Sequence, residues 1–215
     1  VFENNGDGSL FTEVAEQSGL IHWIDGRGMS KFDSDNDGDL DIVIFASGDE
    51  LAYFRNDLIT ADTPAGANQH WIRIALDTRA NDALAPQGIG SMIRVRTDER
   101  EIVLPVHSNS NHCSSSPIEV HSGLGSSSVI DALRVEWADG SFSTLSGVDA
   151  NQILTIEARA YAADLDGSGA VDFGDVSAFV KRYFAADLNT DFTGDWVIDI
   201  FDVLAFIRWY NADVE

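Results

Sequence analysis

The residue pattern best suited to chemistry is a run of aspartates at alternate positions, Asp33-Ser-Asp35-Asn-Asp37-Gly38-Asp39-Leu-Asp41. In a tight turn such side chains converge on one point, and an array of hard oxygen donors suits Ca²⁺, which takes about six to eight of them. Without a cation, each close pair of carboxylates is repelled by roughly 1 to 4 kcal/mol. We therefore predict a calcium loop with the ligands Asp33, Asp35, Asp37, the Asp39 carbonyl and Asp41. A solvated acidic turn is the alternative.

Two further acidic loops lie near the end of the chain, starting at Asp164 and Asp191, which are 27 positions apart. Each has twelve residues, with oxygen ligands at loop positions 1, 3, 5, 9 and 12 and a backbone carbonyl at position 7, a spacing typical of calcium loops. The predicted ligands of the first loop are Asp164, Asp166, Ser168, the Ala170 carbonyl, Asp172 and Asp175. Those of the second loop are Asp191, Thr193, Asp195, the Val197 carbonyl, Asp199 and Asp202. Ca²⁺ is the predicted cofactor of all three loops.

The second of these paired loops departs from the pattern of the first. At position 6 the first loop has Gly169, whereas the second has Trp196. A bulky residue resists the left-handed backbone that glycine allows. Thr193 also stands where a carboxylate is expected. We therefore predict that the second loop binds Ca²⁺ more weakly, or that it is distorted or empty.

The elements that must position the paired loops are two helices, one after each loop. Apolar residues recur at i, i+3, i+4 and i+7, and we expect these positions to be buried. They are Val176, Phe179, Val180 and Tyr183 in one helix and Val203, Phe206, Ile207 and Tyr210 in the other. Phe201, Leu204 and Trp209 are apolar residues in excess of this core. Because an apolar surplus on a small module marks an interface, we predict that they contact a partner or the adjacent β domain.

The middle of the chain is predicted to be all β. Apolar or alternating segments predict strands at 40–45, 51–54, 70–76, 91–96, 101–106, 132–137 and 152–157. Asp139-Gly140 predicts a hairpin turn between Trp137 and Phe142. Gly88-Ile-Gly90 and Gly123-Leu-Gly125 lack the strand–loop–helix context of a phosphate-binding loop, so we interpret them as turn glycines.

A catalytic site is a weaker interpretation of this sequence. His107, His112, Cys113 and His121 lie close together in the chain, so a Cys/His nucleophilic pair or a site of three histidines for a transition metal is conceivable. The segment from Ser108 to Ser116 is polar and loop-like, however. We therefore favour ordinary turns with a structural His121, and we predict that the protein is not an enzyme.

Composition limits the classes of partner. The chain of 215 residues has 36 acidic and 13 basic residues and a formal net charge of −23, which repels nucleic acids and anionic membranes. A salt-adapted acidic surface is a competing explanation of the charge. Hydrophobic residues make up 44%, which is enough for packed cores. A single cysteine excludes an intrachain disulfide, and no apolar run reaches the ~18 residues of a membrane span. Because the chain begins without Met or an apolar signal segment, we expect a mature product or a fragment of a longer protein.

Residues 1–62 resemble a VCBS/FG-GAP repeat of extracellular β-propellers. The resemblance rests on the aspartate loop at 33–41 and on the flanking segments 4–14 and 54–57, which together make about one and a half repeats. It implies a partial propeller-type sheet. Because a propeller needs about four to eight blades, we expect this sheet either to follow removed blades or to pack on something else.

Residues 67–158 resemble an ASPIC/UnbV domain through Gly88-Ile-Gly90, His121-Ser-Gly123-Leu-Gly125 and Val135-Glu-Trp137-Ala-Asp139-Gly140. Ser122 and Ala138 depart from the aromatic residue and the proline of that family. The resemblance implies a β-sandwich-like fold and no particular activity.

Residues 162–215 resemble a type I dockerin, in which residues after the ligands bind a cohesin domain. A clip that attaches the C-terminus to this chain's own β domains is the alternative.

The predicted fold is therefore mainly β with a small C-terminal α module. It comprises a partial propeller-type sheet (1–62), a β-sandwich-like domain (67–158) and dockerin-like paired calcium-loop helices (162–215). The predicted function is that of a secreted, calcium-binding protein–protein interaction module, with a cohesin-like domain or copies of itself as the partner. The alternatives are a self-assembling extracellular filament or matrix subunit, which would be a homo-oligomer, and the accessory C-terminal region of a larger secreted enzyme.

Overall fold

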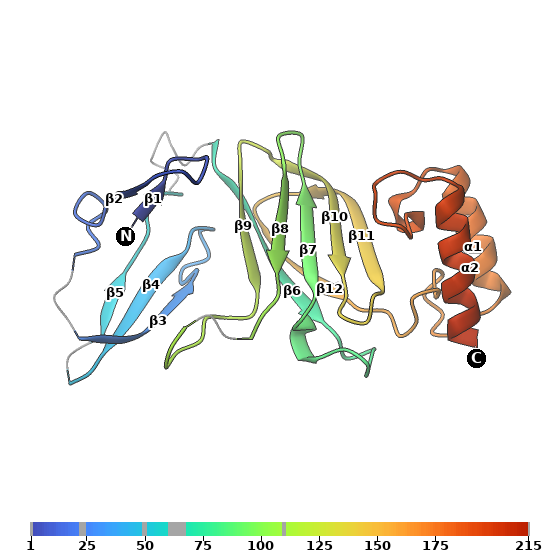
Figure 1. The fold of residues 1–215 in the computed structure, drawn as a ribbon, viewed down its shortest axis with the longest axis horizontal. Helices are drawn as coiled ribbons and strands as arrows, with labels where there is room; N and C mark the ends of the chain where they lie inside the picture. The colour runs from blue at the N-terminus through green and yellow to red at the C-terminus, as the bar shows by residue number, and fades with distance from the viewer. Residues whose placement is uncertain (1, 22–24, 49–50, 60–67, 109–110, 215) are drawn as a thin grey trace. The chain divides into compact units, whose positions relative to one another are not determined.

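The computed structural model describes residues 2–21, 25–48, 51–59, 68–108 and 111–214. The chain forms two compact units, which are described separately below. Unit 1 comprises residues 1–59 and 109–117, and unit 2 comprises residues 60–108 and 118–215. The predicted boundary between the first two domains, at 62–67, lies outside the described residues. Figure 1 shows strands through most of the chain and two helices at its C-terminal end, so the prediction of a mainly β chain with a small C-terminal α module is confirmed.

Unit 1 contains a hairpin and a three-stranded antiparallel sheet. Its strands are β1 (Phe2–Asn4), β2 (Phe11–Glu13), β3 (Gly26–Phe32), β4 (Asp41–Ala46) and β5 (Ala52–Phe54). β1 pairs with β2, and the sheet order is β3-β4-β5. The strands predicted at 40–45 and 51–54 are β4 and β5. The acidic loop 33–41 connects β3 to β4.

β3 was not predicted, because glycines at 26 and 28 interrupt its apolar pattern. Its edge is covered by residues 111–116, which follow the strand side by side within unit 1. The Met29 amide donates to the Ser114 hydroxyl at 2.9 Å, and the Lys31 amide donates to the Ser116 hydroxyl at 3.1 Å. Gly28 is buried beneath this segment, and a Cβ atom there would lie 3.0 Å from Cβ of Ser114. A larger residue at this position would therefore have to displace the crossing segment by a few tenths of an ångström.

The described part of unit 1 buries little apolar surface, because its large apolar side chains are either half-buried or exposed. Its buried hydrophobic residue is Ala52. The exposed ones are Phe2, Leu10, Phe11, Ile21, Met29, Phe45, Leu51, Tyr53 and Leu58. The small apolar burial of this unit agrees with the expectation that its sheet needs neighbours. The propeller resemblance stays a prediction.

Unit 2 contains two sheets that share one hydrophobic core. The strands are β6 (His70–Asp77), β7 (Met92–Arg96), β8 (Glu101–Pro105), β9 (Val120–Gly125), β10 (Val129–Glu136), β11 (Phe142–Asp149) and β12 (Gln152–Glu157), with a 3-10 turn η2 (Pro86–Gly88) after β6. One sheet is antiparallel with the order β11-β10-β7-β8; the other has the order β12-β6-β9 and a parallel β6–β12 pair. Ile72 and Ile74 of the second sheet pack with Ile93, Leu133 and Val135 of the first, all 0–1% exposed.

The two glycine pairs of this unit have different conformations. Gly88 and Gly90 adopt positive φ angles of 70° and 95° in the turn before β7, as predicted. In the second pair, the interpretation as a turn glycine is wrong for Gly123, which lies in β9 and pairs with β6. It is confirmed for Gly125, which has a φ of 62° at the end of β9, where the Ser127 amide donates to the Leu124 carbonyl across a tight turn. Leu124 between them is fully buried, and this burial gives the segment its place in the sheet.

The C-terminal helical module begins with the acidic loop 164–175. Its elements are α1 (Phe173–Phe184), η3 (Leu188–Thr190) and α2 (Ile200–Val214). Phe179 and Phe206, which are 27 positions apart, stack with their ring centroids 4.2 Å apart in the core. The expected burial of Val180 and Ile207 is wrong, since they are 46% and 48% exposed. The helices meet through their i, i+3 and i+7 positions, so the i+4 positions face outward. No described helix is both long and apolar enough to cross a membrane.

The helical module is not separate from the β sandwich in unit 2. Phe142 of β11 belongs to the module's core, and its ring meets that of Phe192 edge to face at 4.8 Å. Phe142 is paired in register with Glu136, and Arg134 lies two residues earlier on the same face of β10. The inner face of this sheet thus packs on the other sheet, while its outer face packs on the helical module.

Candidate metal centres

The first acidic loop brings three of its five predicted ligands together. Asp33, Asp35 and Asp37 each offer a carboxylate oxygen, and these oxygens lie within 4.8 Å of one another. Oxygens that bind one Ca²⁺ at about 2.4 Å lie no further apart than about twice that length. Gly38 has a φ of 101°, and its amide donates to Oδ2 of Asp33 at 3.2 Å. These three carboxylates could therefore hold a metal ion.

Asp41 lies outside the group of three clustered carboxylates, and its role as a ligand stays a prediction. It is 1% exposed, and both carboxylate oxygens accept hydrogen bonds. Oδ1 accepts from the Asn56 amide at 2.7 Å, while Oδ2 accepts from the amide and the hydroxyl of Ser34. Asp41 is therefore placed to fasten the loop to the start of β4 and to the chain after β5. The sequence alone gave no signal for the partners Ser34 and Asn56.

Asp39 is 4% exposed and is only partly satisfied by the protein. Its Oδ2 accepts from the Ile59 amide at 2.9 Å, whereas its buried Oδ1 has no hydrogen-bond partner among the described residues. A buried, unsatisfied carboxylate oxygen is costly, and a cation bound nearby would lower this cost. The sequence-based prediction assigned the Asp39 carbonyl to the metal, so the buried carboxylate is an addition to it.

The pKa values of this loop reflect crowded negative charge. Burial, followed by the charges of Asp39, Asp35 and Asp33, raises the pKa of Asp37. Burial and the charge of Asp41 likewise raise the pKa of Asp39, against the hydrogen bond from Ile59. Burial also acts to raise the pKa of Asp41, but the hydrogen bonds from Ser34 and Asn56 outweigh it and lower the pKa overall. The carboxylates of Asp37 and Asp39 are therefore harder to ionise than a free carboxylate, and a nearby positive charge would favour their ionised form.

The second acidic loop, 164–175, brings together Asp164, Asp166 and Asp175, whose carboxylate oxygens also lie within 4.8 Å of one another. Asp164 shapes the loop by accepting the Gly167 amide at 2.9 Å and the Gly169 amide at 2.9 Å. Asp175 closes the loop: its Oδ1 accepts from the amides of Leu165 and Asp166, and its Oδ2 accepts from the amide of Asp172.

The remaining predicted ligands of this loop lie around the three carboxylates. The Ser168 hydroxyl donates to the Ala170 carbonyl at 3.2 Å, so these two predicted metal ligands are adjacent. Asp172 caps α1 and accepts the Gly174 amide at 2.6 Å. A Cβ atom on Gly174 would lie 2.6 Å from Oδ2 of Asp166. Gly174 therefore leaves room for the carboxylate of Asp166 above the first turn of the helix.

The third loop, 191–202, repeats the scaffold of the second without its carboxylate cluster. Asp191 accepts the Gly194 amide at 2.7 Å and the Trp196 amide at 3.0 Å, and Asp202 accepts the Thr193 amide at 3.0 Å. Trp196 adopts the left-handed conformation, with φ 67°, that a bulky residue was expected to resist. Among the described residues, the groups of three clustered acidic side chains lie in the other two loops.

The third loop differs from the loop 164–175 at two positions that lie close together in that loop. Thr193 stands at the position of Asp166, and Phe201 stands at the position of Gly174. A carboxylate at position 193 would approach the first turn of α2, as the carboxylate of Asp166 approaches Gly174. Thr193 has no carboxylate to make such an approach, and Phe201 is 63% exposed. Asp195 is exposed, and Asp199 caps α2 by accepting the Phe201 amide at 2.8 Å. Val197, the predicted carbonyl ligand, has a side chain that is 55% exposed.

The three predicted contact residues have different surroundings. Phe201 and Leu204 are 63% and 58% exposed. Trp209 is half-buried, and its ring lies against the hairpin turn of the β sandwich, where a Cβ atom on Gly140 would be 3.7 Å away. Of the two roles predicted for this group, contact with the adjacent β domain fits Trp209, whereas Phe201 and Leu204 remain available to a partner.

The histidines and Cys113 are spread over different environments. His107, His112 and Cys113 are exposed, and Cys113 has a left-handed backbone, with φ 56°. His121 lies in β9 and stacks on Trp71 with a centroid distance of 6.2 Å. In the described part of the chain, the clusters of three possible ligands contain aspartates and neither histidine nor cysteine.

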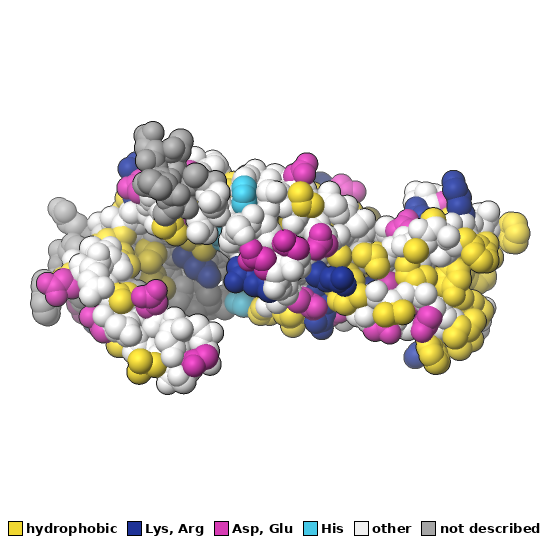
Figure 2. Space-filling model, turned by 90° about the horizontal axis from the view of Figure 1, so that it is seen from above, with side chains coloured by type: hydrophobic (Ala, Val, Ile, Leu, Met, Phe, Trp, Pro, Cys, Tyr) yellow, Lys and Arg dark blue, Asp and Glu magenta, His cyan; other side chains and the backbone are white. Residues whose placement is uncertain are grey.

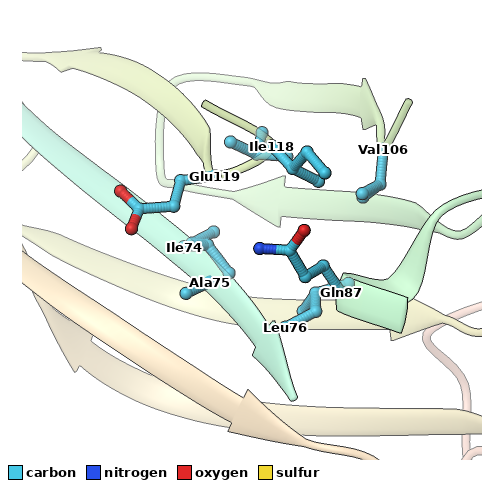
Figure 3. Close-up of a pocket in the computed structure, with 8 residues that line it drawn as sticks. Ile74, Ala75, Leu76, Gln87, Val106, Ile118 and Glu119 are labelled. Atoms are coloured by element: carbon cyan, nitrogen blue, oxygen red, sulfur yellow. The ribbon is translucent and has the colours of Figure 1, made fainter. Parts of the chain in front are cut away.

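Two hollows open on the β sandwich. One has a volume of about 60 Å³ and lies between β6 and the segment before β9. Its lining includes Ile74, Leu76, Val106 and Ile118, with Gln87 and Glu119 as the polar members (Figure 3). Ligand pockets usually have volumes of roughly 300 Å³ or more, so this one is too small for a metabolite. The other is a wider depression of about 550 Å³ around Asp77, Arg79 and Asp82.

Comparison with known families identifies one part of the chain. The family model "ASPIC and UnbV" matches residues 81–162, which confirms the resemblance predicted for the middle segment. The match begins after β6, although β6 is the central strand of the second sheet. β6 therefore completes the fold of the matched segment. No curated protein matches the chain. The VCBS/FG-GAP and dockerin resemblances of the end segments stay predictions.

Proposed function

We propose that this chain is a calcium-stabilised protein-interaction module that works outside the cell. The observation that carries the proposal is an exposed apolar surface on the helical module, in which the loop 164–175 clusters three carboxylates. Calcium sites of modest affinity, about 10⁻⁴ to 10⁻³ M, are filled in extracellular fluids. The ASPIC/UnbV match gives the middle segment a fold without an activity, and we propose no catalytic role.

Calcium would be held by Asp33, Asp35 and Asp37 in unit 1 and by Asp164, Asp166 and Asp175 in unit 2. In both sites the donors are oxygens, and the loop backbone is already hydrogen-bonded around them. The ion would supply positive charge to carboxylates that otherwise repel one another. Its binding energy would add to the stability of the folded loops and would reach about 2.7 kcal/mol when the free ion is at 100 times its dissociation constant.

The partner surface would lie on the outward side of the two helices. Exposed apolar side chains recur there at positions equivalent under the 27-residue repeat, namely Phe173 with Ile200 and Val180 with Ile207. Phe201, Leu204 and Phe184 extend this surface. Figure 2 shows yellow side chains gathered over the end of unit 2 that carries the helices. Apolar area of this kind on a small module is typical of a protein-binding site.

A cohesin domain is the partner class that the dockerin resemblance suggests, and it provides the test. We expect the immobilised chain to bind at least one member of a panel of type I cohesin domains in 1 mM Ca²⁺ (about the upper Kd of extracellular sites) and to lose this binding in chelator. The double variant Phe201→Asp, Leu204→Asp should reduce the affinity by at least about 100-fold, because anchor residues dominate such interfaces.

The matched control is Val103→Asp with Ile153→Asp, which changes two comparably exposed residues on the β sandwich (46% and 48%). This control should bind as the wild type does. Failure of every cohesin to bind, or equal loss of binding in the control, would count against the docking function.

Self-assembly is the second candidate function, and the exposed apolar side chains of unit 1 favour it. Phe11, Phe45 and Leu51 are 51–57% exposed in a unit whose own apolar burial is slight. Such a sheet can be completed by a second copy of the chain. Analytical ultracentrifugation in calcium and in chelator separates the candidates: a calcium-dependent oligomer supports self-assembly, and a monomer that binds cohesin supports docking.

A further inference from the structure

Arg134 is a charged residue in the middle of the β sandwich, in the central strand β10. Its side chain is only 5% exposed, and it points away from the sandwich core toward the helical module. The guanidinium carbon lies 4.0 Å from the centroid of the Phe142 ring, and Phe142 itself belongs to the core of the module. Arg134 is thus enclosed at the contact between the sheet and the third acidic loop.

The guanidinium group holds the first residue of that loop. Nη1 of Arg134 donates to the Asp191 carbonyl at 2.7 Å and lies 3.5 Å from Oδ2 of Asp191. The group also lies close to the loop backbone, because a Cβ atom on Gly194 would be 3.1 Å from Nη2. Asp191 is fully buried and in turn accepts the amides of Gly194 and Trp196. Arg134 therefore contacts the residue that organises the loop.

The two repeats differ in how their first aspartate is compensated. Asp164 stands in a cluster of three carboxylates, which suits a divalent cation. Asp191 has Thr193 in place of that neighbouring carboxylate, and it directly contacts the buried guanidinium of Arg134. The buried guanidinium near the first repeat is that of Arg159: burial lowers its pKa, and the charges of Asp164 and Asp175 oppose this shift. Burial lowers the pKa of Arg134, and the charges of Asp191 and Glu136 oppose this shift. Nε of Arg134 makes no hydrogen bond to any residue that the structure describes, and the nearest Glu136 oxygen is 4.0 Å away, so Asp191 is the main partner of the buried charge.

We propose that Arg134 is a positioning residue that supplies the permanent positive charge of the third loop, so that this loop stays folded and attached to the β sandwich without a divalent cation. Only the second loop, 164–175, then depends on calcium for its order within the helical module. This inference goes beyond the proposed function, because it concerns the loop that lacks a carboxylate cluster and does not require that any partner bind.

Amide hydrogen exchange, followed by NMR on the whole chain, tests this proposal. Matched amides report on the two loops: Gly167 and Gly169 donate to Asp164, while Gly194 and Trp196 donate to Asp191. In chelator, the wild-type amides of Gly194 and Trp196 should exchange at the rate seen in calcium. In Arg134→Gln they should exchange at least about tenfold faster, because the loss of a buried charged hydrogen bond destabilises the loop locally.

Arg94→Gln is the matched control. Arg94 is the register partner of Arg134 on β7, but its hydrogen bonds go to Glu136 and Glu101 rather than to the loop. It should leave the amides of Gly194 and Trp196 unchanged, and Arg134→Lys should restore part of the wild-type protection. Amides of Leu133 and Val135 in β10 report whether a variant keeps its fold.

Two results would overturn the proposal. One is loss of protection at Gly194 and Trp196 when calcium is removed from the wild type, a measurement that needs no variant. The other is unchanged protection in a folded Arg134→Gln variant. If chelation alters neither loop, the calcium proposal fails for 164–175, whereas the role of Arg134 is still decided by Arg134→Gln.

Discussion

Replacing Asp175 with alanine is expected to lower the free energy of unfolding of unit 2 by roughly 3 kcal/mol in chelator, since each buried donor left without a partner costs about 1–3 kcal/mol. Asp175 is fully buried and accepts three backbone amides, from Leu165, Asp166 and Asp172. In millimolar calcium the loss should be larger, because the variant also lacks one of the three clustered carboxylates. Urea unfolding followed by tryptophan fluorescence, in calcium and in chelator, measures both values.

Asp202→Ala is the matched variant in the third loop. Asp202 is equally buried and accepts the amides of Thr193 and Asp199. We expect a similar loss of stability in chelator and no additional loss in calcium. If Asp175→Ala cost the same with and without calcium, Asp175 would not be a metal ligand. If it cost less than about 1 kcal/mol in chelator, its hydrogen bonds would not be what holds the loop.

The second large effect is expected at Phe142. Replacing it with alanine should destabilise unit 2 by about 3–5 kcal/mol, the usual cost of removing a buried aromatic ring. The ring is 7% exposed, packs against Phe192 and lies beneath the guanidinium of Arg134. Its loss removes a contact between the β sandwich and the helical module, so thermal unfolding of the module should move to lower temperature.

Leu145→Ala provides the comparison on the same strand. Leu145 is 38% exposed and should cost less than about 1 kcal/mol. Packing of the helical module on the sheet would be contradicted if Phe142→Ala were as mild as Leu145→Ala. It would also be contradicted if Phe142→Ala destabilised the sandwich while the melting of the helices stayed unchanged.

Many of the regular elements and the acidic loops could be predicted from local patterns, whereas β3 and β9 could not. Alternation predicted β7 and β10, the Asp139-Gly140 turn predicted the β10–β11 hairpin, and the 27-residue repeat predicted both helices and the burial of Phe179 and Phe206. These features depend on residues that are near one another in the chain. The same holds for the clustering of Asp33, Asp35 and Asp37, since a single tight turn brings them together.

Contacts between distant segments could not be predicted in the same way. Arg134 has the sequence neighbours of an outward-facing strand residue, and nothing near it indicates that Asp191 will cover it. Asp41 has the spacing of a ligand, and its hydrogen bond from the backbone amide of Asn56, fifteen positions away, could not be predicted. Val180 and Ile207 fit an apolar stripe, but the crossing of the two helices decides which side of that stripe is buried. In each case the partner is chosen by tertiary packing.

Calorimetric titration of the chelator-treated chain with calcium, against magnesium as the control, tests the central claim most directly. The two carboxylate clusters predict two saturable calcium ions per chain, with much weaker binding of magnesium. Asp166→Asn should remove one of these ions, and Asp35→Asn together with Asp37→Asn should remove the other. Absence of saturable calcium binding, or an unchanged number of ions in both variants, would contradict the account.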